Sequence, residues 1–104
     1  MMLLTTLALM LAAAPAAAPE VKVSISSLKY KPAVVQVNVG DTVVWTNDDD
    51  ADHTVTAETF KSGNISSGKS FSQKFEKAGE YPYHCDYHPR MKGKVVVVAG
   101  GKKK

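Results

Sequence analysis

The chain has 104 residues, a formal net charge of +3 and one cysteine. This length accommodates one small domain with a modest hydrophobic core. A single cysteine excludes an intramolecular disulfide framework. The basic residues form no stripe interleaved with aromatic residues, and this argues against nucleic-acid binding.

Residues 1–18 are predicted to be a secretory signal peptide. Residues 3–14 form an apolar run, small residues follow, and the composition turns polar at Pro19 and Glu20. The run is shorter than the roughly 20 apolar residues of a membrane-spanning helix, and it has no polar face with which to lie on a membrane. We therefore expect a soluble protein without a membrane span, located in the periplasm or otherwise exported.

Short runs that are β-branched or that alternate in polarity predict strands along the rest of the chain. The predicted strands are residues 21–26, 35–39, 42–46, 53–56, 70–75, 80–85 and 94–99. Glycine, proline and clustered polar residues predict the connections between them. These connections are residues 28–32, 40–41, 47–52, 59–69 and 78–79.

About seven short strands, frequent turn signals and no convincing helix after residue 18 favour an all-β fold, an antiparallel β-sandwich. We expect one domain over residues 19–99. Residues 100–104 consist of two glycines and three lysines, so they are expected to form a basic flexible tail.

The stretch from Tyr83 to Gly93 carries the most chemical information in the chain. It contains Cys85, then His88 three residues later and Met91 three residues after that. Soft sulfur ligands select copper, and two histidines, one cysteine and a weak axial methionine form the donor set of electron-transfer copper sites. The stretch therefore predicts three of the four ligands of such a site.

Two other histidines could supply the missing imidazole. Alternation along a strand places His84 on the face opposite Cys85, so His84 is predicted to be a surface residue. His53 follows the acidic loop and is 32 residues before Cys85 (85 − 53). We predict His53 as the fourth ligand, contributed by a different part of the fold.

Cys85 also allows other interpretations. A free cysteine is often a buried, inert core residue, and in an exported protein it could form an intermolecular bridge. A nucleophilic Cys–His pair would need an exposed thiolate and an orienting group, and it gives Met91 no role. A zinc site is disfavoured because methionine is a poor zinc ligand.

The residues around this stretch resemble the C-terminal copper loop of the cupredoxins. The resemblance covers residues 78–85, His88-Pro89, Met91, Gly93 and the valines that follow, and its ligand spacing is similar to that of short-loop members. Residues 39–43, Trp45 and His53 resemble the first ligand region of the family. The resemblance implies a Greek-key β-sandwich of about seven or eight strands, with one type 1 copper ion held by His53, Cys85, His88 and axial Met91.

The same resemblance implies a function. We expect a monomeric carrier that is not an enzyme and that shuttles single electrons between redox proteins docking near His88. A copper carrier with the same ligands is the alternative. Arg90 and the aspartates of residues 48–52 put charge beside the expected docking face, so the partners of relatives do not transfer safely to this chain.

One contact between the two ligand segments is left open by the sequence. Thr54 follows the first histidine and Asp86 follows the cysteine. Either the Thr54 hydroxyl donates to the Asp86 carboxylate and ties the segments together, or both side chains are simply solvated.

Overall fold

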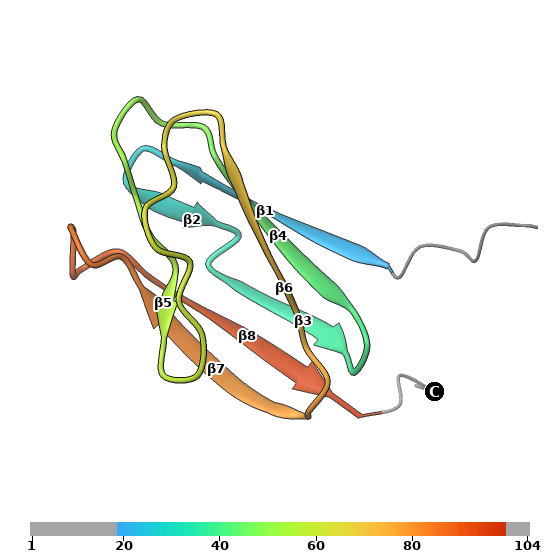
Figure 1. Cartoon of the computed structure of the whole chain (residues 1–104). Helices are drawn as coiled ribbons and strands as arrows, with labels where there is room; N and C mark the ends of the chain where they lie inside the picture. The colour runs from blue at the N-terminus through green and yellow to red at the C-terminus, as the bar shows by residue number, and fades with distance from the viewer. Residues whose placement is uncertain (1–18, 100–104) are drawn as a thin grey trace, which may run out of the picture.

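The computed structural model of the protein describes residues 19–99, so the predicted signal peptide (1–18) and basic tail (100–104) lie outside the described residues. Within that range the chain forms eight strands, arranged in two four-stranded sheets that face each other (Figure 1). The strands are β1 (Glu20–Ser26), β2 (Lys29–Lys31), β3 (Val34–Asn38), β4 (Thr42–Asn47), β5 (Thr56–Ala57), β6 (Ser70–Lys74), β7 (Gly79–His84) and β8 (Lys92–Val98). The described residues contain no helix with the length and apolar character needed to span a membrane. The predicted all-β sandwich is confirmed.

The two sheets are mixed rather than antiparallel throughout. One sheet has the order β2-β1-β4-β6 and the other β3-β8-β7-β5. β1 pairs in parallel with β4, and β3 pairs in parallel with β8, while the remaining neighbours are antiparallel. For β1 and β4 the reason is a crossover: the chain leaves the first sheet after β2, forms β3 in the second sheet and returns as β4. A crossover of this kind is what parallel neighbours require.

The core forms where alternate side chains of the two sheets meet. Val23 and Ile25 of β1 and Val43 of β4 are buried, as are the inward residues of β3 and β8. Burial of each such aliphatic side chain contributes about 1.5–3 kcal/mol. Trp45, with no exposed surface, lies against Phe71 at a centroid distance of 5.7 Å and meets Tyr83 edge-on at 5.4 Å. The core therefore lies between the two sheets, and the loops at one end of the sandwich are where a functional site is expected.

The connection predicted at residues 28–32 instead contains a strand, β2. Ser27 and Leu28 form the turn before it, with φ values of +55° and +59°. β2 then pairs with β1, and Tyr30 turns inward between two exposed lysines. The buried Tyr30 hydroxyl donates to the carbonyl oxygen of Thr54 at 2.6 Å, a distant partner that local sequence patterns do not reveal.

The strand predicted at residues 53–56 is shorter than expected. Its first residues pair with the neighbouring loop, since the backbones of His53 and Ile65 bond to each other. Only Thr56 and Ala57 join the sheet, as β5. The loop of residues 59–69, predicted as a surface connection, therefore also supplies the core with Phe60 and Ile65.

Candidate metal centre

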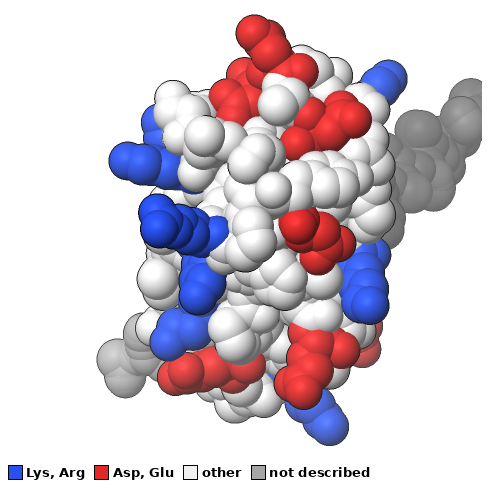
Figure 2. Space-filling model, turned by 90° about the vertical axis from the view of Figure 1, so that its left-hand side faces the viewer, with Lys and Arg blue, Asp and Glu red and all other residues white. Residues whose placement is uncertain are grey.

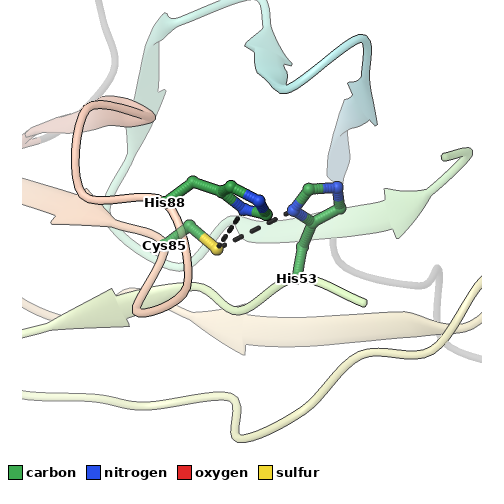
Figure 3. A group of neighbouring side chains, drawn as sticks. All are labelled: His53, Cys85 and His88. Carbon is green, nitrogen blue, oxygen red and sulfur yellow. Dashed lines mark hydrogen bonds between the residues drawn. The ribbon is translucent and has the colours of Figure 1, made fainter. Parts of the chain in front are cut away.

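Three predicted site residues meet at the end of the sandwich where the loops gather (Figure 3). The Sγ atom of Cys85 lies 3.7 Å from Nδ1 of His53 and 3.8 Å from Nδ1 of His88. All three donor atoms are within 4.8 Å of one another. The structure thus brings together side chains from two segments that are far apart in the sequence.

The three side chains differ in their exposure. His53 and Cys85 have no exposed surface, whereas His88 is partly exposed. The two imidazole rings are tilted, with centroids 5.3 Å apart. The cluster is therefore closed on the His53 side and reaches the surface on the His88 side.

The loop between β7 and β8 is closed by its own backbone. The amide of Cys85 donates to the carbonyl of Met91 at 3.1 Å, and the amide of Met91 donates to the carbonyl of His88 at 2.8 Å. Met91 itself is buried, with 4% of its surface exposed. His84 is exposed and pairs with the Asp86 carboxylate at 3.3 Å, so it faces away from the cluster as its position in the strand predicts.

Asp49 belongs to this site, and sequence reasoning missed it. Its Oδ2 atom lies 2.9 Å from Nε2 of His53. An ionised carboxylate can only accept a hydrogen bond, so we assign the ring proton to Nε2. Nδ1 of His53 then carries the lone pair and faces Cys85, as a metal ligand must.

The turn between β1 and β2 fixes the Asp49 carboxylate by two hydrogen bonds. The amides of Ser27 and Leu28 donate to its two carboxylate oxygens at 2.9 and 3.1 Å. These hydrogen bonds, with a smaller contribution from His53, lower the pKa of Asp49 below its usual value. The carboxylate is therefore ionised beside the buried ring.

Thr54 and Asp86 connect the two ligand segments, but not in the way the sequence suggested. Neither of the two alternatives left open by the sequence is found: the Asp86 carboxylate pairs with His84 and not with the Thr54 hydroxyl, and Thr54 is buried rather than solvated. Instead, the backbone amide of Asp86 donates to Oγ1 of Thr54 at 2.8 Å. The segments are tied together through the backbone, and this contact depends only on the hydroxyl of Thr54.

Two buried tyrosines lie close in the chain or by hydrogen bond to the ligand segments: Tyr83 is two residues before Cys85, and the Tyr30 hydroxyl donates to the carbonyl of Thr54. Tyr30 meets Tyr83 edge-on with a centroid distance of 4.6 Å. Burial raises the pKa of Tyr30 above its usual value and raises the pKa of Tyr83 to about 12. Both phenols are therefore neutral.

An apolar hollow surrounds the exposed side of His88. It is lined by Leu28, Tyr87, His88, Pro89, Arg90 and Met91. Leu28 and Tyr87 each expose about half of their surface, and the Tyr87 hydroxyl donates to Oδ1 of Asn64 at 2.8 Å. Figure 2 shows the face that includes this end of the molecule, with an uncharged central strip, basic side chains mainly along its left side, and acidic side chains above it, to its right and below it.

The donor set fits a soft metal ion. At metal–sulfur and metal–nitrogen lengths of about 2.3 and 2.0 Å, a trigonal ion would hold sulfur and nitrogen about 3.7 Å apart. The two separations in this structure, 3.7 and 3.8 Å, match that value. One thiol and two imidazoles, with a thioether on the same loop, form the combination that suits copper.

A small β-sandwich with a thiol and two imidazoles gathered at one end defines the architecture of a cupredoxin. The chain matches the family model of the cupredoxin-like domain over residues 1–97. The chain belongs to the cupredoxin family.

Relatives of known structure and sequence agree with this assignment. The chain is 38% identical to amicyanin from Paracoccus denitrificans over 93 residues, which cover 83% of this chain and 71% of that protein. It is 34% identical to chloroplastic plastocyanin from Tetradesmus obliquus over 86 residues, which cover 68% of this chain and 59% of that protein. A solved structure of an amicyanin variant in the Cu(I) form matches with a TM-score of 0.75 and 37% identity, covering 80% of this chain and 86% of that one.

Proposed function

We propose that the protein binds one copper ion and carries single electrons between redox proteins. His53, Cys85 and His88 would hold the ion, and the thioether of Met91 on the same loop would be a further, weaker ligand. The observation that carries the proposal is the buried Cys85 Sγ atom between two imidazole Nδ1 atoms, at 3.7 and 3.8 Å. When bound there, copper supplies reversible one-electron exchange between Cu(II) and Cu(I).

The residues around the site would hold the ligands in the same positions in both oxidation states. Asp49 orients His53, and Thr54 links the His53 segment to the Cys85 segment. The Tyr30 hydroxyl donates to the carbonyl of Thr54 and so supports the same segment. Such constraint from surrounding groups is what keeps ligand geometry fixed.

We place the electron exchange with partner proteins at His88. Its ring is the part of the cluster that reaches the surface, and the surrounding hollow is mainly apolar. Arg90 on one side and the exposed residues Asp48, Asp50 and Asp52 of the acidic loop add charge to this end of the molecule. Charges of this kind govern the encounter rate and the choice of partner more than the affinity.

Electron transfer is favoured over the delivery of copper. A carrier that hands over its ion needs ligands that a recipient can reach, whereas His53 and Cys85 have no exposed surface. Four protein ligands would also leave no coordination position for a substrate, so we propose that the protein is not an enzyme.

We further propose that residues 1–18 direct export, that the monomeric domain of residues 19–99 acts in the periplasm or an equivalent compartment, and that residues 100–104 are a basic segment outside this domain. The apolar composition of the first 18 residues and the terminal lysines support these assignments. The amino-terminal sequence and the mass of the exported protein would test them.

The proposed function is tested by adding Cu(II) to the protein and recording its visible spectrum. A thiolate bound to Cu(II) gives an intense blue colour, which Cys85→Ser should abolish. His84→Ala is the matched control, because His84 is exposed and faces away from the cluster. A colourless wild-type protein, or a blue Cys85→Ser variant, would refute the proposal, and ready loss of Cu(I) to a chelator would favour the carrier role.

A further inference from the structure

We propose that Asp49 is a positioning residue, a carboxylate clamped by the β1–β2 turn that fixes His53 for metal binding and thereby sets the affinity and reduction potential of the site. This inference rests on the proposed function. It concerns a residue that is not itself a ligand and that acts through its hydrogen bond to His53 and through its charge.

The contact between Asp49 and His53 is buried on the histidine side. The Nε2–Oδ2 distance is 2.9 Å, the His53 side chain has no exposed surface, and 20% of the Asp49 side chain is exposed. A hydrogen bond to an ionised acceptor in such a place is stronger than a neutral one. It selects the Nε2–H tautomer and leaves Nδ1 free to face Cys85.

The clamp on Asp49 comes from a part of the chain about twenty residues earlier. Ser27 and Leu28 are consecutive residues in the left-handed region of φ, an unfavourable conformation for side chains other than glycine. In this conformation their two amides point at the same carboxylate. Successive amides of a turn make a concave site for an anion, and here the anion is the side chain of Asp49.

The loop that carries Asp49 is fixed at its base as well. The amide of Asp49 donates to Oδ1 of Asn47, and the Asn47 amide group donates to the carbonyls of Ala51 and Ile65 at 2.8 and 2.9 Å. The amide of Asp48 donates to the carbonyl of Ile25 at 2.8 Å. The carboxylate therefore has a defined position rather than that of a side chain in a solvated acidic loop.

These contacts predict two effects on the metal. A carboxylate behind a ligand histidine raises its basicity and fixes its ring, and removal of such a partner typically costs about 10–100-fold in metal affinity. The negative charge also favours Cu(II) over Cu(I), because the oxidised ion is the more positive. Removal of the carboxylate should therefore raise the reduction potential.

The test compares Asp49→Ala with Asp50→Ala, which removes an equal charge from an exposed neighbour in the same loop. In metal-free protein at mildly alkaline pH, nitrogen NMR of the His53 ring should report a single Nε2–H tautomer in wild type and Asp50→Ala and a mixture in Asp49→Ala. Cu(II) affinity, measured against a competing chelator, should fall about 10–100-fold in Asp49→Ala and stay within about twofold of wild type in Asp50→Ala. A wild-type tautomer with wild-type affinity in Asp49→Ala would overturn the proposal.

A second variant and the measurement on metal-free protein cover the cases in which Asp49→Ala does not fold or wild type binds no copper. If Asp49→Ala does not fold, Asp49→Asn preserves the size of the side chain but cannot accept from Ser27, Leu28 and His53 together, so its Cu(II) affinity should also fall at least several-fold. Wild-type affinity in folded Asp49→Asn would overturn the inference. If wild type takes up no Cu(II), the proposed function fails, while the tautomer in metal-free protein still decides whether Asp49 positions His53.

Discussion

The two histidines of the cluster belong to regions with different physical characters. His53 is fully buried, its backbone pairs with Ile65, and its ring is held by an ionised carboxylate. His88 lies on the short loop after β7, is partly exposed, and is surrounded by an apolar hollow. The same residue type therefore has two roles: one ring is fixed inside the fold, and the other is the contact of the site with the outside.

The largest effect of this difference is expected on the free energy of unfolding of the metal-free protein. His53→Ala should lower the free energy of unfolding by about 2–4 kcal/mol, because it leaves a cavity and deprives Asp49 of a partner. His88→Ala should change it by less than about 1 kcal/mol. Urea unfolding followed by the fluorescence of the buried Trp45 measures both values, and equal losses in the two variants would contradict the comparison.

The second test concerns the point where the exposed loop returns to the sheet. A Cβ atom at Gly93 would overlap the ring and hydroxyl of Tyr83. Gly93→Ala should therefore destabilise the protein by about 1–3 kcal/mol through overpacking. The double variant with Tyr83→Val, measured in the same urea experiment, should lose less than the sum of the two single changes, and strict additivity would show that the overlap is not the cause.

The third test breaks the link between the two regions. Thr54→Val removes the acceptor of the Asp86 amide and should cost about 1–2 kcal/mol of unfolding free energy. Thr54→Ser retains the hydroxyl and should stay close to wild type. The copper-loaded Thr54→Val protein should also show a changed reduction potential, and an unchanged potential together with unchanged stability would mean that the two segments are held independently.

The smallest effect is expected at Asp86. Its carboxylate is about half exposed and pairs only with His84, whereas its backbone amide makes the link to Thr54. Asp86→Asn should therefore alter the unfolding free energy by less than about 0.5 kcal/mol. A loss as large as that of Thr54→Val would mean that the carboxylate, not the amide, ties the two ligand segments.

The sequence predicted the His88 region better than the His53 region. Cys85, His88 and Met91 lie within seven residues, so their spacing alone points to one loop and one kind of chemistry. His53 could be predicted as a ligand only by elimination of His84 and by resemblance to the cupredoxins. Its location beside Cys85 depends on the packing of two sheets, which spacing along the chain does not encode.

Asp49 could not be predicted because its carboxylate is held by two separate places in the chain, the turn at Ser27 and Leu28 and the ring of His53. It is one of four aspartates between residues 48 and 52, a composition typical of a solvated loop. Only the fold shows that the turn at Ser27 and Leu28 reaches it. The short strand β2 was missed for a similar reason, since the hydroxyl of its buried residue Tyr30 has its partner in the distant Thr54 carbonyl.

The central claim is that one copper ion, held between His53, Cys85 and His88, exchanges a single electron without leaving the protein. A redox titration of the copper-loaded protein, followed by its visible absorption, tests this most directly. We predict one electron per chain, a slope of about 59 mV per tenfold change in the ratio of oxidised to reduced protein, and full return of the colour over repeated cycles. Loss of copper on reduction, or a spectrum that does not return, would contradict it.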